Sequence, residues 1–402
     1  MKLNKPFYII LTLGLLSAIG PFSIDMYLPG FPKIAESLHT TVSKIGLSLS
    51  SFFIGISFGQ LLFGPLLDRF GRKTPLYIGL IVYIATSVLC AFVVNVEQLI
   101  VIRFLQALGS CGGMVAARAL VRDLFPVNEN AKVFSYLMLV IAISPILAPT
   151  FGGYITSFLG WHAIFICLAI IATLTLFAVY LWLPEGNPPN KEMSLKPIPI
   201  IHGFVEVAKV PKFYTYALVS SLSASGLYAY ISGSPFVFME LYHLSEKHYG
   251  WVFAFIGLGL TLASQVNTLL LKKFRSEQIT TMALTLQITL AFLMVILVQF
   301  HWINLFILIS LIWLYISSQG FIFPNASALC LAPFSKSAGT ASALMGAVQL
   351  GIGAIVTAIV SSLNSTSEMP MVFCMLICTV SAGIALYIGR NYIAHSFATR
   401  DY

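Results

Sequence analysis

Residues 43–73, SKIGLSLSSFFIGISFGQLLFGPLLDRFGRK, join a long apolar run to a short charged turn. A helix needs about 20 apolar residues to cross the roughly 30 Å hydrocarbon core of a bilayer, and the first part of this stretch supplies them. Similar runs recur along the whole chain. Of the 402 residues, 58% are hydrophobic and 9% are charged, and the mean hydropathy is +0.92, which excludes an ordinary globular protein. The solvent for most of this chain is therefore lipid.

The apolar runs predict helices rather than strands. Strands of a membrane β-barrel are about half as long and alternate in polarity, and this sequence does not follow that pattern. We predict an all-α integral membrane protein. Its twelve transmembrane helices are expected at residues 7–28, 43–66, 75–95, 98–122, 133–156, 162–183, 213–238, 248–271, 278–299, 303–328, 337–362 and 370–391.

The basic residues indicate the orientation of these helices, because Lys and Arg collect on the cytoplasmic side of a membrane. With the N-terminus inside, 17 of the 22 lysines and arginines are cytoplasmic, three are outside, and two, Arg103 and Arg118, fall within the fourth span. Both termini are therefore predicted to be cytoplasmic. The net charge of +8 is a topology signal, so we expect a lipid bilayer and no nucleic acid as partner.

A segment rich in proline and lysine, residues 184–212, is the only long polar stretch and separates two groups of six spans. We predict an N-terminal six-helix bundle at 1–183, a cytoplasmic linker at 184–212 and a C-terminal six-helix bundle at 213–402. A shift of about 205 residues aligns the halves, for example Leu66–Phe70 with Leu270–Phe274. Such a repeat is typical of transporters that bind substrate near the midplane between two bundles and work by alternating access.

Two ionisable residues inside the spans carry the predicted mechanism, since such groups cost several kcal/mol in a bilayer and mark functional sites. Asp25 is the only carboxylate well inside a span, and Arg103 lies at a similar depth, so both could face one cavity. Burial disfavours an ionised carboxylate and a nearby guanidinium favours it. Movement of Asp25 relative to Arg103 or to water would then make it take up or release a proton. The alternative is a structural ion pair between the two spans.

The turn between the second and third spans, GPLLDRFGRK at residues 64–73, places a carboxylate in a tight basic loop. Glycine permits the turn and close helix approach, and a carboxylate stabilises the positive N-terminal end of a helix. Residues 337–340, which open the eleventh span, are a plausible target for Asp68, and Arg72 is expected to pair with Asp123. The alternative is that the basic residues of this turn only set the orientation of the spans in the membrane. The predicted cytoplasmic gate comprises Gly64, Asp68, Arg69, Gly71, Arg72 and Asp123.

The fifth span contains the sequence PILAPTFGG at residues 145–153. Proline removes a backbone hydrogen bond and small residues allow close packing or a bend. We predict that Pro145, Pro149, Gly152 and Gly153 form a hinge or a seal between the halves, with ordinary helix kinking as the alternative.

These motifs resemble those of the major facilitator superfamily over essentially the whole chain. The 64–73 turn looks like the family's signature loop between helices two and three, and Arg103-x-x-Gln106-x-x-Gly109 looks like its helix-four motif. The stretch APTFGG at 148–153 looks like its antiporter motif, although that motif usually opens with Gly-Pro rather than Ala-Pro.

Three further stretches, IDMYLP at 24–29, ARALVRD at 117–123 and SGSPF at 232–236, resemble the Bcr/CflA branch of multidrug:proton antiporters, a DHA1 type of drug efflux. This resemblance implies export of phenicols, bicyclomycin or sulfonamides across a bacterial inner (cytoplasmic) membrane. It also implies that Asp25 and Arg103 correspond to the helix-one acid and the helix-four arginine that couple transport to protons.

The pocket is expected on the first, fourth, seventh and tenth spans. An aromatic and amide lining with a single acid favours uncharged or weakly polar aromatic drugs over sugars or phosphates. Each of these side chains could equally serve in packing. The candidate substrate-binding residues are Tyr27, Gln106, Tyr228, Tyr230, Phe236, Gln319, Phe323 and Asn325.

Two other functions compete with drug export. A proton-coupled importer of a specific metabolite would use the same Asp25. A non-transporting membrane receptor would leave the duplicated halves unexplained. An enzyme is not expected, since no catalytic constellation or metal-ligand spacing converges inside the spans. We expect a monomer that uses no cofactor or metal, with small-molecule substrates and protons as partners.

Overall fold

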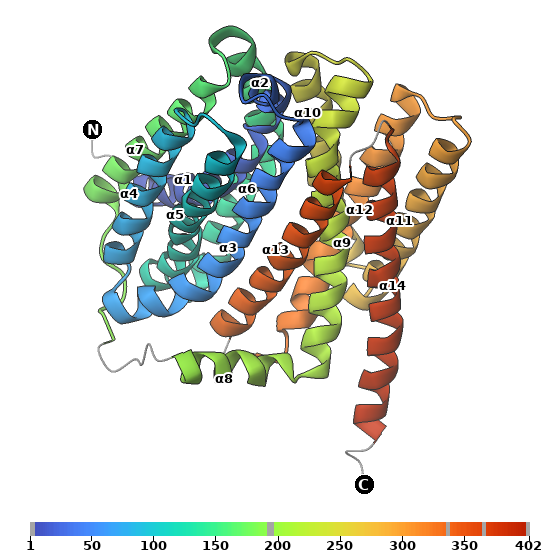
Figure 1. Ribbon diagram of the computed structural model, residues 1–402. Coiled ribbons are helices and arrows are strands. Elements are labelled where there is room, and N and C mark those ends of the chain that lie inside the picture. Colours follow the sequence, from blue (N-terminus) through green and yellow to red (C-terminus); the bar gives the residue numbers. More distant parts are fainter. Residues whose placement is uncertain (1–4, 191–196, 335–337, 364–366, 399–402) are drawn as a thin grey trace. The chain divides into compact units, whose positions relative to one another are not determined.

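The computed structural model describes residues 5–190, 197–334, 338–363 and 367–398. Within these ranges every regular element is a helix, and two of them, η1 and η2, are a 3₁₀ and a π helix (Figure 1). The predicted all-α class is therefore confirmed.

Eleven candidate spans among the described residues are long and apolar enough to cross a membrane, which makes the chain a multi-pass membrane protein. The first candidate span combines α1 (Lys5–Asp25), η1 (Leu28–Gly30) and α2 (Phe31–Ser37). The others are α3 (Val42–Phe70), α4 (Lys73–Cys90), α5 (Val96–Leu124), α6 (Val127–Leu159), α7 (His162–Trp182), α10 (Glu246–Leu270), α11 (Ser276–Gln299), α12 (Leu305–Leu331), α13 (Ala338–Ser362) and α14 (Met369–Ala398).

One further helix, α9 (Pro211–Pro235), occupies the predicted seventh span and continues into η2 (Phe236–Leu241). It is long enough to cross a bilayer but is not among the eleven apolar candidates. Its serines, such as Ser220, Ser221 and Ser223, are fully buried, because α9 packs against α12, α13 and α14. A helix enclosed by its neighbours can carry small polar residues that lipid would not tolerate. The count of twelve spans thus stays a prediction, with α9 as the twelfth.

The helices form two compact units. Unit 1 comprises Met1–Leu195 and Leu244–Ala254, and unit 2 comprises Lys196–His243 and Phe255–Tyr402. In unit 1, α5 packs against α1, α3 and α4, and α1 also packs against α6 and α7. In unit 2, α9 holds the central position and α11 packs against α12 and α14.

Close backbone contact in unit 1 depends on small residues along α3 and α5. A Cβ atom on Gly55 would lie 2.6 Å from the carbonyl oxygen of Phe104, and one on Gly109 would lie 2.7 Å from the carbonyl oxygen of Gly79. Both distances are too short for a side chain, so α3 and α4 can lie against α5 only because these positions are glycine. This packing places the polar side chains of α5 inside unit 1.

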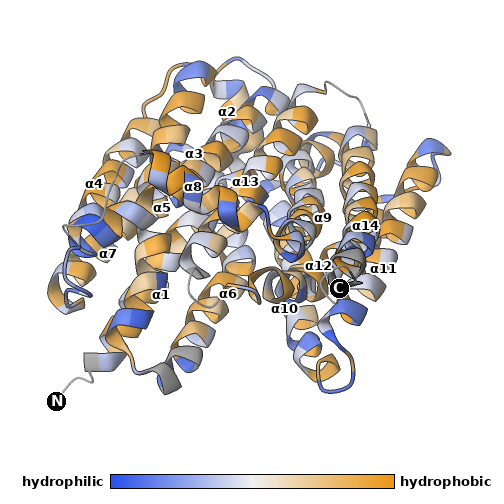
Figure 2. Cartoon of the chain, turned by 90° about the horizontal axis from the view of Figure 1, so that it is seen from below, coloured by the Kyte–Doolittle hydropathy of each residue, from blue (hydrophilic) through white to orange (hydrophobic). Residues whose placement is uncertain are grey.

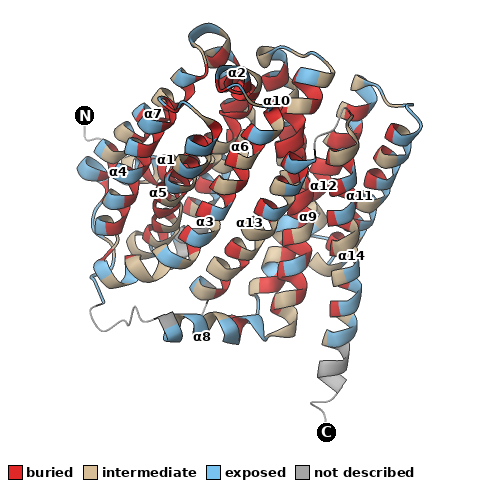
Figure 3. Cartoon of the chain, in the orientation of Figure 1, coloured by how far each residue is buried: buried red, intermediate tan, exposed pale blue. Residues whose placement is uncertain are grey.

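The surfaces of the helices suit a lipid environment. Hydrophobic residues dominate along the helices, and hydrophilic residues gather near their ends (Figure 2). Many large apolar side chains are exposed among the described residues, including Phe58, Phe92 and Leu174. Exposed positions recur along the helices in Figure 3. In water such exposure would favour aggregation, whereas in a bilayer it is the expected state.

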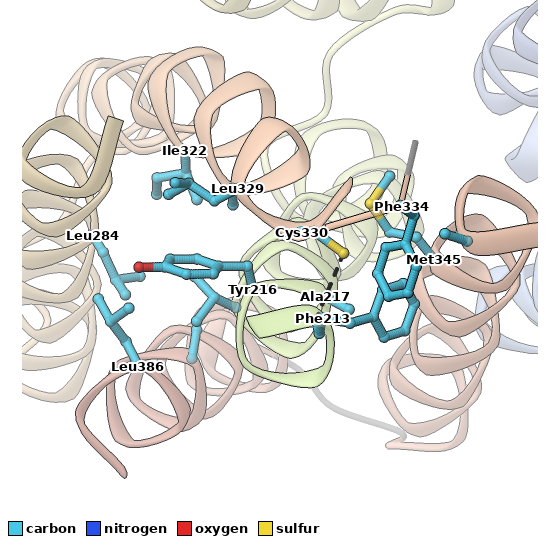
Figure 4. Packing of buried hydrophobic residues seen from close by; sticks show 14 of the residues in the cluster. Phe213, Tyr216, Ala217, Leu284, Ile322, Leu329, Cys330, Phe334, Met345 and Leu386 are labelled. Carbon is cyan, nitrogen blue, oxygen red and sulfur yellow. Dashed lines mark hydrogen bonds between the residues drawn. The ribbon is translucent and has the colours of Figure 1, made fainter. Parts of the chain in front are cut away.

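Unit 2 has a continuous apolar core around the start of α9 (Figure 4). Phe213 meets Phe334 edge to face with ring centroids 5.6 Å apart, and the Cys330 thiol donates to the Phe213 carbonyl oxygen over 3.6 Å. The same cluster includes Val207 of α8 (Pro197–Ala208), a helix that lies inside the predicted linker. This helix was not predicted from the sequence, because twelve residues are too few to span a bilayer.

Candidate functional site

Asp25 is the last residue of α1 and is 5% exposed. The next residues turn through η1, where Pro29 stands near the start of the short helix. Among the described residues, the ion pairs do not include one between Asp25 and Arg103. The interpretation of these two residues as a structural ion pair is therefore wrong for this structure.

Arg103 lies fully buried on α5 and is held by contacts other than a carboxylate. Its Nη1 donates to Gln106 Oε1 over 2.7 Å, and its Nη2 donates to the backbone oxygen of Ser23 over 3.0 Å. The guanidinium carbon also lies 4.1 Å from the centre of the Phe52 ring and 4.7 Å from that of Tyr27. Cation–π contacts of this kind strengthen when water is excluded. Arg103 is thus tied to α1 two residues before Asp25.

A chain of hydrogen bonds surrounds this arginine. Gln106 Nε2 donates to Ser87 Oγ over 2.7 Å, which orients the amide so that its oxygen faces Arg103. The hydroxyls of Tyr83 and Ser23 lie 2.6 Å apart, and those of Tyr27 and Ser48 lie 2.8 Å apart. We call these side chains the Arg103 network, which comprises Ser23, Tyr27, Ser48, Phe52, Tyr83, Ser87, Arg103 and Gln106.

The network changes the interpretation of two predicted pocket residues. Tyr27 and Gln106 are both fully buried, and both contact Arg103. Their polar atoms are engaged within unit 1, which fits a role in positioning the arginine. Ser23, Tyr83 and Ser87 were missed by the sequence analysis. Ser23, two residues before Asp25, and the i,i+4 spacing of Tyr83 and Ser87 on one helix face were the available signals.

One donor of Arg103 is unused. Its Nε is buried and has no hydrogen-bond partner among the described residues. Leaving a donor of a buried cation unpaired is costly, so the guanidinium can still bind an acceptor that approaches it. A buried cation in this state favours the ionised form of any carboxylate that moves towards it.

The predicted ion pair between Arg72 and Asp123 is confirmed. Arg72 Nε donates to Asp123 Oδ2 over 2.7 Å, and Arg72 Nη1 also pairs with Asp68. Partial burial lowers the pKa of Arg72, but the hydrogen bonds and charges of Asp123 and Asp68 outweigh this effect and leave the pKa raised above its usual value. The arginine therefore stays charged and links the ends of α3 and α5.

The segment after α7 completes this cluster and was missed by the sequence analysis. Asp123 accepts hydrogen bonds from the backbone and side-chain nitrogens of Asn187, at 3.0 and 2.8 Å. The backbone N–H of Lys73 donates to Glu185 over 3.1 Å, and that of Asn190 donates to the Asp68 carbonyl oxygen over 2.9 Å. The only signal in the sequence was the polarity of residues 185–190. The first residues of the predicted linker thus brace the gate turn from within unit 1.

The glycines in and near the predicted gate differ in backbone conformation and in the space available for a side chain. Gly71 has a φ of +83°, which side chains disfavour. A Cβ atom on Gly186, which was not predicted, would lie 2.6 Å from Asp123 Oδ2. A Cβ atom on Gly64 would meet no atom within 4 Å, so the expected close helix approach at Gly64 is wrong among the described residues.

Two further predictions about the gate concern Arg69 and the target of Asp68. Arg69 Nη1 donates to the Asn190 carbonyl oxygen over 3.5 Å, a long contact at an exposed position. Ser337, in the proposed target of Asp68, lies outside the described residues. The Asp68 carboxylate is used by Arg72 within unit 1.

The antiporter-like motif lies next to the end of α1. The helix α6 is continuous over 33 residues and contains Pro145 and Pro149. A Cβ atom on Gly152 would collide with the backbone carbonyl of Met26, the residue after Asp25, and one on Gly153 would lie 2.5 Å from the carbonyl oxygen of Glu246. These two glycines therefore permit backbone contacts that no other residue allows.

The other predicted pocket residues lie in unit 2 on α9, η2 and α12. Gln319 is 3% exposed, and the Ser223 hydroxyl lies 2.5 Å from Gln319 Oε1 and 2.7 Å from Gln287 Oε1, so the two amide oxygens share its one proton. We call Ser223, Gln287 and Gln319 the Gln319 network. Asn325 donates to Asn267 Oδ1 over 2.6 Å and is likewise buried. Both amides thus connect helices of unit 2.

The aromatic members of the predicted pocket differ in exposure. The Tyr228 hydroxyl accepts from Gln349 Nε2 over 3.5 Å, and Tyr230 is buried. Phe236 opens η2 and is half-buried, while Phe323 on α12 is 39% exposed. Tyr228, Phe236 and Phe323 thus retain accessible ring surface.

The chain resembles known proteins over nearly its whole length. A sequence profile described as Major Facilitator Superfamily matches residues 13–358. The "Bicyclomycin resistance protein homolog" of Haemophilus influenzae is 32% identical, with 96% of each chain covered. The "Chloramphenicol resistance protein" of Pseudomonas aeruginosa is 28% identical, with 94% of this chain and 89% of the relative covered. The "Multidrug resistance protein MdtL" of Escherichia coli O9:H4 is 29% identical, with 82% of each covered.

A solved structure shares the fold. It is described as a bacterial homolog of the human lysosomal transporter Spinster in an inward-facing and unoccupied conformation. The TM-score is 0.70 at 14% sequence identity, with 97% of each chain covered. At this identity the likeness concerns the fold alone.

Proposed function

Because the chain belongs to the Major Facilitator Superfamily and is therefore a membrane transporter rather than an enzyme, we propose that it exports small drug-like molecules in exchange for protons. The relatives reported above are bacterial, which places it with multi-pass transporters of the bacterial inner membrane. Alternating access of one binding site to the two sides of the membrane is the proposed mode of transport.

The proposed substrates are small aromatic compounds that are uncharged or weakly polar, of the phenicol, bicyclomycin or sulfonamide type. The names of the bicyclomycin and chloramphenicol resistance relatives support this class. So do the ring surfaces of Tyr228, Phe236 and Phe323, since aromatic side chains bind flat apolar solutes. The fully buried Tyr27 and Gln106 are assigned to positioning Arg103 instead.

Proton coupling is proposed to rest on Asp25. The observation that carries it is a buried carboxylate with no ion pair to Arg103, placed two residues after the backbone oxygen that holds that arginine. In the proposed cycle a protonated Asp25 remains in its apolar site, and exposure to water or an approach to Arg103 releases the proton. Drug binding and proton binding compete because each favours a different position of the end of α1.

Proton release in inside-out membrane vesicles tests this proposal. Wild type is expected to dissipate a proton gradient when a phenicol or a sulfonamide is added and to accumulate the drug inside the vesicle. Asp25→Asn removes the titratable group at nearly constant volume, so coupled transport should fall to background. Glu97 is an exposed carboxylate in the first turn of α5. Glu97→Gln is therefore the matched control and should behave as wild type.

Each alternative has its own outcome. Retained coupling in Asp25→Asn would show that the proton uses another residue, while drug export would still stand. Accumulation of a metabolite in the opposite direction would identify an importer. Absence of any flux in wild type with the whole drug panel would contradict the proposed substrates and favour a receptor.

A further inference from the structure

The short helix α8 (Pro197–Ala208) has an unusual exposed surface. Ile198, Ile201 and Val205 are 80%, 57% and 42% exposed. Their spacing of three and four residues puts them on one side of the helix. These residues form an apolar stripe along most of α8, which we call the α8 stripe.

The other two sides of α8 have different partners. Val207 is 4% exposed and belongs to the core cluster of unit 2, and Ile200 and Phe204 on the same side are half-buried. The third side is polar, and there Lys209 Nζ, just beyond the helix, donates to Glu206 Oε1 over 2.9 Å. This hydrogen bond lowers the pKa of Glu206, which therefore stays ionised and needs water. The helix thus has a protein-facing side, a water-facing side and an apolar side that is left largely exposed by the described residues.

The direction of α8 suits a membrane surface. It packs against α9 and α13 and runs across the end of α9 rather than along it (Figure 1). The spans α9 and α14 run side by side (Figure 1), so a helix across the end of α9 lies near the plane of the bilayer surface. A helix with apolar and polar sides in this orientation can bury its apolar side about 5–10 Å into the headgroup region.

Charge in unit 2 is strongly unequal between its two ends. Within the part of unit 2 that the structure describes, every Lys and Arg lies at the α8 end, and Arg390 Nη2 donates there to the Glu277 carbonyl oxygen over 2.8 Å. The opposite end carries Glu240 and Glu368. The basic residues at the α8 end are Lys209, Lys212, Lys272, Lys273, Arg275 and Arg390, and the acidic ones are Glu206 and Glu277.

We propose that α8 is a membrane-surface helix that inserts Ile198, Ile201 and Val205 among the headgroups of anionic lipids. The excess of basic residues at this end complements negative headgroups, and each Lys or Arg close to such a surface contributes about 1 kcal/mol of attraction. The inference goes beyond drug export, because it concerns a surface of unit 2 that has no part in the proposed coupling. It gives the helix inside the predicted linker a defined attachment to the bilayer.

Spin labels on the full-length protein test the insertion directly. Ile201→Cys lies on the α8 stripe, and His202→Cys is its matched control on the polar side, where the native side chain is 72% exposed. The six native thiols are buried, except for a half-buried Cys167, so labelled wild type provides the background. In vesicles with phosphatidylglycerol, collisions with oxygen, which partitions into lipid, are compared with collisions with a water-soluble nickel chelate.

The expected result is an oxygen-to-nickel ratio about threefold or more higher for the Ile201→Cys label than for the His202→Cys label. Equal access of both labels to nickel would overturn the proposal, because the stripe would then face water. Shielding of the Ile201→Cys label from both agents would also overturn it, because another part of the chain would cover the stripe. In vesicles of phosphatidylcholine alone the difference should shrink, and an unchanged ratio would contradict the role of anionic lipid.

Discussion

The two units each bury a polar network between helices, but only unit 1 places a charge in it. The Arg103 network surrounds a guanidinium with neutral acceptors and aromatic rings. The Gln319 network joins α9, α11 and α12 through a hydroxyl and two amides, with no ionised member. The fourth and tenth spans, α5 and α12, occupy equivalent places in the predicted repeat.

This difference suggests how duplicated halves divide their work. Burying a charge costs free energy, and a buried charge interacts strongly with a nearby group that gains or loses a proton. Neutral amides mainly hold helices together and interact only weakly with such a group. The proposed coupling therefore belongs to unit 1. Unit 2 is free to vary its aromatic surface with the substrate. The predictions below test this division, beginning with the largest effect.

Arg103→Gln should damage transport most. Glutamine removes the charge and retains only part of the hydrogen bonding, so we expect the coupling between proton release and drug export to fall by about 5- to 150-fold. Arg103→Lys should rescue it poorly, because an ammonium group lacks the planar fork that reaches Gln106 and Ser23 together. Drug-induced proton release in vesicles is the measurement. Coupling at the wild-type level in both variants would remove Arg103 from the mechanism.

Gly152→Val should be the most destabilising change at the motif on α6. Its Cβ would collide with the backbone carbonyl of Met26, and overpacking of this kind typically costs about 1–3 kcal/mol. Gly203→Val is the matched control, because a Cβ on Gly203 meets no atom within 4 Å. Thermal unfolding can be followed with a thiol-reactive dye that labels the buried cysteines as they become exposed. Equal melting temperatures of Gly152→Val and Gly203→Val would contradict this prediction, because α1 and α6 could then move apart without loss of stability.

Gly186→Ala and Gly64→Ala should differ although both glycines belong to the gate region. The methyl group on Gly186 would press on Asp123 and on Arg72, so we expect a loss of about 1–2 kcal/mol and weaker gate closure. Gly64→Ala should be neutral or slightly stabilising within α3, since no atom lies within 4 Å and alanine favours helix. The same dye assay compares the two. A larger loss for Gly64→Ala would mean that its side of α3 is covered in another conformation.

Ser223→Ala should have the smallest effect. It removes the hydroxyl shared by Gln287 and Gln319, which typically costs about 1 kcal/mol for a neutral hydrogen bond. Proton release per drug molecule should stay at the wild-type value, because no charge is altered. Lost coupling with a normal melting temperature would contradict the division of roles between the units.

Some partners could be predicted from the sequence and others could not. Arg72 and Asp123 are both conspicuous charges at the ends of spans, and their ion pair was predicted and found. Asp25 and Arg103 were recognised as functional candidates by the same argument, and the alternative of a direct ion pair between them is absent from the described residues. Arg103 instead takes a backbone oxygen and an amide, groups that occur everywhere in a sequence and give no signal of their own.

The linker shows the same limit. Its polarity predicted a connection between two halves. Nothing local distinguished Asn187, which binds Asp123, from the other polar residues nearby. The sequence pattern did not predict α8 because its twelve residues fall short of the about 20 that a span requires.

The sequence by itself determined that this chain crosses the membrane many times, that charges cluster at one end of its helices, and that the ionisable groups inside the spans are few. Each of these properties follows from local composition, because transfer into lipid is decided residue by residue. Only the tertiary structure decided which groups satisfy those charges. Arg103 and the Ser23 carbonyl are 80 residues apart in sequence, and only the packing of α5 against α1 brings them within 3.0 Å.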